Sequence, residues 1–166
     1  MPFSIEEINH FAQREFTASI GWVFEHSPWV AERAWHRRPF SSLEQVAEKM
    51  DGEVAAASTE EKLALLRAHP DLGTRAKMSE SSSVEQAGVG LDRLTKGEYE
   101  RLIGLNGAYR ERFGFPFLYA VKGSDKFAIL EALERRLSAD REDEFQEALR
   151  QVYRIARFRL ESLINE

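Results

Sequence analysis

The residues best suited to chemistry lie at the end of a predicted helix, in the stretch H-P-D-L-G from His69 to Gly73. Proline ends a helix, so Pro70 should hold the imidazole of His69 at a rigid corner that faces outward. Imidazole titrates near neutral pH and can act as a general acid or base. A histidine at a helix end can also do no more than cap carbonyls and interact with the helix dipole.

A second cluster of polar residues follows at Ser82, Glu85 and Gln86. Glu85 could be a carboxylate partner for His69, and the amide of Gln86 could hydrogen-bond a planar urea or amide. The alternative is structural, because Ser82 and Glu85 have the spacing of a capping box at a helix start. Taken with His69, the cluster suggests acid–base chemistry on a small polar molecule without a cofactor.

A third candidate is Arg159, in the last predicted helix and next to the apolar position Leu160. It could border a pocket and bind a carboxylate through two parallel hydrogen bonds. The alternative is that Arg159 is solvated, as most arginines are in a run such as this one with Arg154 and Arg157.

Several kinds of site are excluded or not expected. The chain has no cysteine, so disulfides, thiolate catalysis and zinc–thiolate sites are impossible. The histidines show no H-x-x-x-H or H-E-x-x-H spacing, so no metal site is expected. There is no G-x-x-x-x-G-K phosphate loop and no G-x-S-x-G elbow.

Composition predicts an ordinary globular protein. The 166 residues are enough for one domain, expected to span 1–166, with 43% hydrophobic and 31% charged residues. A net charge of −5 argues against nucleic acid or an anionic membrane as partner, since both need a basic surface. The start lacks a secretory signal and no apolar run is long enough to span a membrane, so a cytoplasmic location is expected.

Helix-start signals dominate the chain. In an S/T-x-x-E box the hydroxyl accepts a hydrogen bond from a free backbone N–H and the carboxylate reaches back to the cap. Ser27 followed by Pro28 predicts another start, with proline at the first helical position. The boxes are Ser4 with Glu7, Ser41 with Glu44, Ser58 with Glu61, Ser82 with Glu85, and Thr95 with Glu98.

Apolar residues at helical spacing follow these starts and indicate which face of each helix is buried. The stripes include Ile5, Ile8, Phe11 and Ala12 near the start, Tyr99, Leu102, Ile103, Leu105 and Tyr109 in the middle, Ile129, Leu130, Leu133 and Leu137, and Phe145, Leu149, Val152, Ile155, Ala156 and Leu160 near the end.

The stretch Phe113 to Val121 is aromatic and β-branched, but Pro116 removes a ladder donor, so an extended connector between helices is expected. Loops are expected at Asp51–Ala57, His69–Ser81, Gly88–Thr95 and Gly114–Ser124. The predicted fold is an all-α, single-domain bundle of about seven or eight helices.

Five motifs occur in order along the chain: H-P-D-L-G from His69, S-x-x-E-Q from Ser82, A-G-V-G-L from Ala87, L-N-G-A-Y from Leu105 and F-G-F-P-F from Phe113. In this order they resemble the 2-oxo-4-hydroxy-4-carboxy-5-ureidoimidazoline (OHCU) decarboxylases of purine catabolism. The resemblance covers nearly the whole chain and implies an all-α, cofactor-free enzyme, commonly a homodimer. It also implies the final reaction from urate to (S)-allantoin, with loss of CO2.

The resemblance implies roles for individual residues. It makes His69 and Glu85 the catalytic pair, and the arginine before leucine in the last helix corresponds to Arg159. The backbone of the F-P-F segment contacts ligand in the family. The substrate-binding residues implied in this way are Pro70, Ser82, Gln86, Phe117, Leu118, Tyr119, Ala120 and Arg159.

Two other functional classes remain open on the residues alone. One is a non-enzymatic helical interaction module, in which the corner at His69 is only a helix stop. The other is an isomerase or hydrolase of a related ureide that uses the same acid–base pair. Convergence of His69, Glu85 and Arg159 on one concave site would argue against the interaction module. Release of CO2 from freshly generated substrate separates decarboxylation from the isomerase or hydrolase.

Overall fold

The computed structural model describes residues 2–72, 90–91 and 93–165. These residues form eight α-helices, two short 3-10 helices and a single isolated bridge between Phe3 and Ile164. The predicted all-α class is therefore confirmed. The contacts group into two compact units, one formed by Met1–Ala68 with Tyr153–Glu166 and the other by His69–Val152. The single domain over 1–166 stays a prediction.

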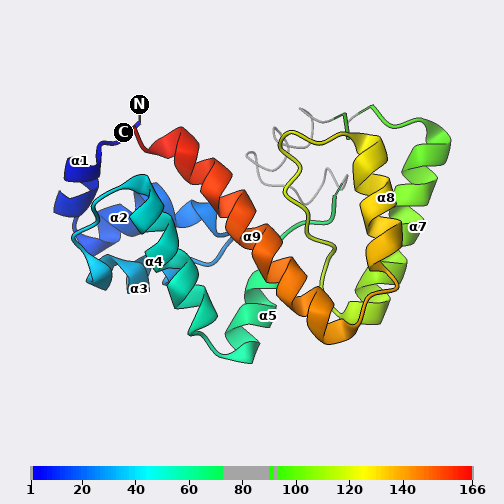
Figure 1. Ribbon diagram of the computed structural model, residues 1–166, viewed down its shortest axis with the longest axis horizontal. Helices are drawn as coiled ribbons and strands as arrows, with labels where there is room; N and C mark the ends of the chain where they lie inside the picture. Colours follow the sequence, from blue (N-terminus) through cyan, green and yellow to red (C-terminus); the bar gives the residue numbers. More distant parts are fainter. Residues whose placement is uncertain (1, 73–89, 92, 166) are drawn as a thin grey trace. The chain divides into compact units, whose positions relative to one another are not determined.

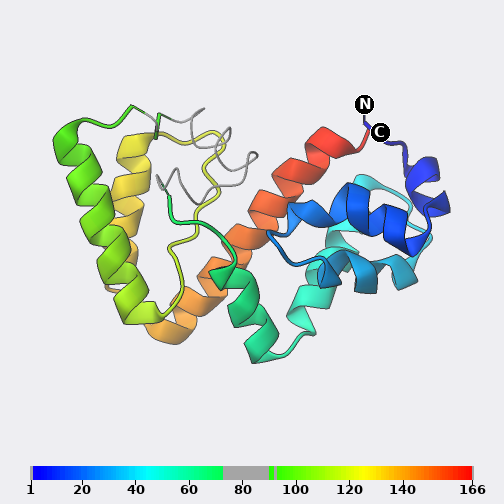
Figure 2. The ribbon, with the colours of Figure 1, turned by 180° about the vertical axis from the view of Figure 1, so that it is seen from behind.

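The first unit packs short helices around an apolar core, with the two chain ends side by side (Figures 1 and 2). The Phe3 N–H donates to the carbonyl of Leu163 at 2.7 Å, and the Asn165 N–H donates to the carbonyl of Phe3 at 2.8 Å. The elements are α1 (Ile5–His10), α2 (Gln13–Ile20), η1 (Gly21–Val23), α3 (Trp29–Ala34), η2 (Trp35–Arg37), α4 (Leu43–Ala55), α5 (Thr59–Arg67) and the later part of α9 (Arg141–Leu163).

The second unit contains α7 (Lys96–Phe113), α8 (Lys126–Arg136) and the earlier part of α9. Helices α7 and α8 lie side by side in both views (Figures 1 and 2). Helix α7 ends at Gly114, whose φ of 80° is left-handed and suits glycine. Aromatic rings fill the core, where Tyr109 contacts Phe113, Phe115 and Phe117 at centroid distances of 4.6, 6.0 and 5.4 Å.

Three of the predicted capping boxes are confirmed, at Ser4, Ser58 and Thr95. The box predicted at Ser41 and Glu44 is wrong by one residue. Ser42 is the cap and accepts from the Gln45 N–H at 3.1 Å. Gln45 reaches back to the Ser41 N–H at 2.8 Å, so a glutamine replaces the expected glutamate. The box at Ser82 and Glu85 lies outside the described residues.

Two predictions about the first unit are corrected. The loop expected at Asp51–Ala57 is wrong, because α4 continues to Ala55 and buries Val54 completely. The apolar stripe from Ile5 to Ala12 is not one helix, because Phe11 and Ala12 are both extended. The Phe11 carbonyl instead accepts a hydrogen bond from the Trp35 indole at 2.8 Å, which satisfies the backbone at the break.

Two helix details also differ from expectation. Helix α3 begins at Trp29 without a side-chain cap, because the Ser27 hydroxyl donates to the carbonyl of Glu25 at 2.9 Å.

In α7 the buried face includes Leu102 and Tyr109, but the predicted stripe members Tyr99 and Ile103 are 51% and 43% exposed. The polar Asn106 takes a core position there, which a search for apolar periodicity overlooks.

The prediction that Phe113 to Val121 connects helices and is not a strand is confirmed for residues 115–121, which form neither helix nor strand, whereas Phe113 is the last residue of α7. Within the described ranges, none of the helices combines the length and the apolar character needed to cross a membrane.

Candidate active site

His69 lies two residues beyond the end of α5, as the sequence predicted. Helix α5 begins after the Ser58 capping box and ends at Arg67, with Ala68 as its C-cap residue. The expectation that the imidazole faces outward is wrong, because His69 is only 5% exposed. The imidazole of His69 is therefore shielded from bulk water.

The corner that follows His69 is held by α7. The buried Asn106 donates from Nδ2 to the carbonyl of Leu72 at 3.0 Å. One turn later, Arg110 pairs with the carboxylate of Asp71 at 3.2 Å. Since both contacts fall within three residues of His69, α7 fixes the chain on the C-terminal side of the imidazole. This gives the L-N-G-A-Y motif a physical role that its sequence did not reveal.

Arg159 is buried in the first unit and is not a solvated surface arginine. Its side chain is 3% exposed and lies 3.4 Å from the carboxylate of Glu25, itself 5% exposed. The same Nη1 donates to the carbonyl of Val23 at 3.3 Å, and the guanidinium lies 5.7 Å from the ring centre of Trp22. Glu25 is a buried acidic partner that no sequence pattern indicated.

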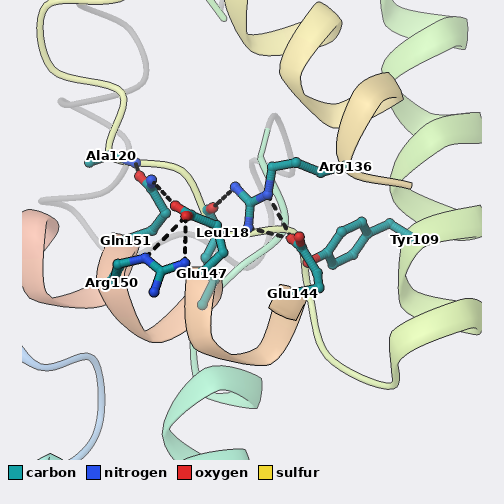
Figure 3. Close-up of polar contacts among 8 residues, drawn as sticks. All are labelled: Tyr109, Leu118, Ala120, Arg136, Glu144, Glu147, Arg150 and Gln151. Carbon is teal, nitrogen blue, oxygen red and sulfur yellow. Dashed lines mark hydrogen bonds and ion pairs between the residues drawn. The ribbon is translucent and has the colours of Figure 1, made fainter. Parts of the chain in front are cut away.

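The segment Phe117–Ala120 is held by side chains of α8 and α9 (Figure 3). Arg136 donates to the carbonyl of Leu118 at 2.7 Å, and Gln151 accepts from the Ala120 N–H at 2.9 Å. Phe117, Leu118 and Ala120 are buried, whereas Tyr119 is half-buried and its hydroxyl lies 3.1 Å from Ser124 Oγ.

Arg136, which holds this segment, is itself part of a buried hydrogen-bond network with Glu144 and Tyr109 (Figure 3). Arg136 pairs with Glu144 at 2.5 Å, and the Tyr109 hydroxyl donates to the same carboxylate. Burial, together with this hydrogen bond, raises the pKa of Tyr109, so its phenol stays protonated and remains a donor. Sequence reasoning missed Arg136 and Glu144, because a charged residue at either end of a helix is usually solvated.

A separate pocket lies in the first unit, between α4 and α9. Its volume is about 360 Å³, and burial raises the pKa of Asp51 to about 7. The pocket is lined by Glu44, Ala47, Glu48, Asp51, Tyr153, Arg154, Arg157 and Phe158. The sequence did not indicate it, because the stretch containing Asp51 was expected to be a loop.

The predicted site residues are thus only partly described. His69, Pro70 and Phe117–Ala120 belong to the second unit, and Arg159 belongs to the first. Ser82, Glu85 and Gln86 lie outside the described residues, so the geometry around Glu85 stays a prediction.

Comparison with known proteins gives the family. A family model described as OHCU decarboxylase matches residues 9–161. The uric acid degradation bifunctional protein PucL of Bacillus subtilis is 48% identical over 99% of this chain, which spans 33% of that protein. The 2-oxo-4-hydroxy-4-carboxy-5-ureidoimidazoline decarboxylase of Halalkalicoccus jeotgali is 46% identical over 96% of this chain and 91% of its own.

A solved structure agrees with these relatives. The crystal structure of (S)-allantoin synthase has a TM-score of 0.81 and 35% identity to this chain, covering 98% of it and 54% of the solved chain. The present chain therefore spans about half of that protein and a third of PucL, but nearly all of the Halalkalicoccus relative. On the family match over residues 9–161, this chain belongs to the OHCU decarboxylase family.

Proposed function

We propose that this chain decarboxylates 2-oxo-4-hydroxy-4-carboxy-5-ureidoimidazoline to (S)-allantoin and CO2, the last step from urate to allantoin. The observation that carries the proposal is the family match over residues 9–161, a range that includes every proposed site residue. The substrate is thus a small, anionic molecule rich in amide groups.

The substrate's own structure explains how the reaction can proceed without a cofactor. Its carboxylate is on C4, next to a C5=N imine. When the bond from C4 to the carboxylate breaks, its electron pair forms a C4=C5 double bond, and the imine nitrogen accepts the displaced charge and takes up a proton. The C4 hydroxyl then loses its proton to become a carbonyl, and C5 takes up a proton. The imine is the electron sink that other decarboxylases obtain from a cofactor.

The protein must then orient the carboxylate, move protons and protonate C5 from one face. We assign His69 as the acid–base group near the C4 hydroxyl and carboxylate. Its burial supports this role, because a proton held away from bulk water is delivered only to a bound group. Glu85 is the proposed partner, which handles the hydroxyl or a ring N–H and helps the proton reach C5.

The remaining residues bind and orient the substrate in this proposal. Arg159 supplies positive charge for the anionic substrate, and its guanidinium is already desolvated in the first unit. Pro70 shapes the corner beside His69. Ser82, Gln86 and the backbone of Phe117–Ala120 hold the ureido and ring amides.

We also propose that the protein is a homodimer, needs no cofactor, and acts in the cytoplasm without nucleic-acid or membrane partners. The family resemblance supports the dimer, and the net charge of −5 disfavours an anionic partner. Light scattering on the purified protein tests the dimer, and full activity after exhaustive chelation tests the absence of a metal requirement.

The function is tested by coupling urate oxidase and 5-hydroxyisourate hydrolase to this protein, since the substrate must be made fresh. We expect faster CO2 release than in its absence and optically active allantoin of S configuration. Racemic allantoin formed at the uncatalysed rate contradicts the proposal, whereas substrate loss without CO2 release supports a hydrolase or isomerase.

A further inference from the structure

Two main-chain groups of the segment Phe117–Ala120 are held by buried side chains (Figure 3). Gln151, 7% exposed, accepts from the Ala120 N–H at 2.9 Å, and Arg136, 8% exposed, donates to the Leu118 carbonyl at 2.7 Å. A buried backbone group left without a partner destabilises the folded state. These two contacts therefore restrict where the segment can lie.

The two anchoring side chains are themselves held in one orientation. Gln151 Nε2 donates to Glu147 at 2.7 Å, which leaves the amide oxygen of Gln151 facing Ala120. Arg136 Nε donates to Glu144 at 2.6 Å, and Glu144 also accepts from Tyr109. Each contact to the segment is thus backed by a second hydrogen bond, which is how a binding element is kept rigid.

Within the described residues, each anchor engages one polar atom of a peptide group beside Tyr119 and leaves the other atom of that group without a hydrogen bond. In the described part of the chain, no hydrogen bond engages the main-chain N–H or C=O of Phe117 or Tyr119. In a trans peptide group the N–H and the C=O point in opposite directions. The Tyr119 N–H therefore points away from Arg136, which holds the Leu118 carbonyl, and the Tyr119 carbonyl points away from Gln151, which holds the Ala120 N–H. A free N–H and C=O side by side can pair with the acceptors and donors of a urea or cyclic amide.

We propose that Gln151 and Arg136 are positioning residues, which hold this segment so that the peptide groups of Tyr119 bind the ureido or ring amides of the substrate. The proposal rests on the proposed function. Neither side chain touches the substrate. Their anchoring of Leu118 and Ala120 determines which edge of the segment faces it.

The test uses Gln151, because loss of Arg136 would leave the buried Glu144 unpaired and could prevent folding. Gln151→Leu removes the acceptor for the Ala120 N–H and keeps a side chain of similar size. The matched control is Gln146→Leu, at an exposed position of the same helix, where the amide donates to Glu142. The rescue variant is Glu147→Gln with Gln151→Glu, which restores an acceptor at 151 and a donor at 147.

Binding of non-reacting amides is the same in the ground and transition states, so its loss raises KM and leaves kcat unaltered. We expect Gln151→Leu to raise KM about 10-fold with kcat within about 3-fold of wild type. The Ala120 amide should also exchange with deuterium at least about 10-fold faster. Gln146→Leu should match wild type in both measurements, and the double variant should recover most of the loss.

A merely structural role gives a different pattern. It lowers the apparent kcat in proportion to the folded fraction and leaves KM unaltered, and that result overturns the proposal. An unaltered exchange rate of the Ala120 amide in Gln151→Leu overturns it too. If wild-type protein fails to convert the substrate, the proposed function is wrong, and the exchange rate still decides whether Gln151 anchors the segment.

Discussion

The imidazole of His69 is the residue on which the proposed chemistry depends most. It is 5% exposed, directly before Pro70, and the chain beyond it is held to α7 through Leu72. Burial of an ionisable group without a functional reason is costly, so the position favours a role that the helix-stop interpretation does not supply.

Replacement of His69 by Ala or Gln should lower turnover by at least about 100-fold, the usual contribution of a general acid or base. Helix content by circular dichroism should stay at the wild-type value, since α5 ends before His69. His10→Ala is the matched control, because His10 is exposed at the end of α1. A near-normal rate in His69→Ala would show that the assigned role is wrong.

Glu85 has two possible roles that a single substitution separates. If it is the catalytic partner, Glu85→Gln should cut the rate far more than it lowers Tm. Glu7→Gln is a suitable reference, because Glu7 has the same position in the confirmed capping box of α1. Glutamine can keep the capping hydrogen bond, as Gln45 does at Ser41, so Glu7→Gln removes mainly a negative charge near the helix N-terminus, worth about 0.3–1 kcal/mol. A fall in Tm like that of Glu7→Gln, with little loss of rate, would assign Glu85 to a helix cap.

Asp51 predicts a dependence of stability on pH. Its pKa is raised by burial from 3.8 to about 7, so the folded state keeps the proton that the unfolded state releases above pH 3.8. The free energy of unfolding therefore falls as pH rises from about 4 to about 7. Arg157 opposes the shift by favouring the charged form, and Tyr153 lines the same pocket.

Replacement of Asp51 by Asn should raise Tm at pH 8 and have little effect at pH 4. We expect the free energy of unfolding at pH 8 to rise by roughly 1 kcal/mol and Tm by about 2–4 °C. The effect is no larger because the carboxyl group of Asp51 is only half-buried and still contacts water. Thermal melts at both pH values measure this, with Glu48→Gln as a control one turn earlier on α4. An equal change at both pH values would contradict the assignment to ionisation.

At the scale of elements, α7, α8 and α9 of the second unit are joined by the buried contacts of Arg136, Glu144 and Tyr109. The side chains of Arg136 and Glu144 are 9% and 2% exposed, so little water is available to replace either partner. The network therefore determines how the three helices support the segment after α7, a role that apolar packing alone does not specify.

Removal of one partner from this network should be strongly destabilising. Arg136→Met leaves Glu144 buried without its counter-charge and should cost about 3–5 kcal/mol. Tyr109→Phe keeps the ring and loses only one hydrogen bond to a charged group, at about 1–3 kcal/mol. Urea denaturation measures both changes. A larger loss for Tyr109→Phe than for Arg136→Met would contradict this order.

At the scale of the whole molecule, each compact unit contains residues of the proposed site. His69 belongs to the second unit and Arg159 to the first, and α9 runs through the boundary at Tyr153. Arg159 is held by Glu25, so its guanidinium is fixed before any substrate arrives.

Arg159→Lys keeps the positive charge near Glu25 but loses the planar fork that can bind a carboxylate through two hydrogen bonds. We expect KM to rise about 10-fold, since each tenfold change corresponds to about 1.4 kcal/mol of binding. Arg154→Lys, at an exposed position of the same helix, should leave KM unaltered. If the KM of Arg159→Lys equals that of Arg154→Lys, Arg159 does not bind the substrate.

The sequence by itself determined the local structure of this protein. Capping boxes at Ser4, Ser58 and Thr95, the end of α5 before His69 and the connector after α7 depend on neighbours within a few residues, which sequence spacing reports directly. The ordered motifs also predicted the family, which the comparisons confirm.

Only the tertiary structure decided which polar side chains are buried and what they hold. The contacts of Arg136 with Leu118 and of Gln151 with Ala120 join residues 18 and 31 positions apart, and Glu25 meets Arg159 across 134 positions. Such pairings depend on how the helices pack. The sequence does not show which charged residues are buried, because most charged residues in proteins are exposed. The burial of His69 was decided in the same way, by packing beyond the corner that its own sequence predicts.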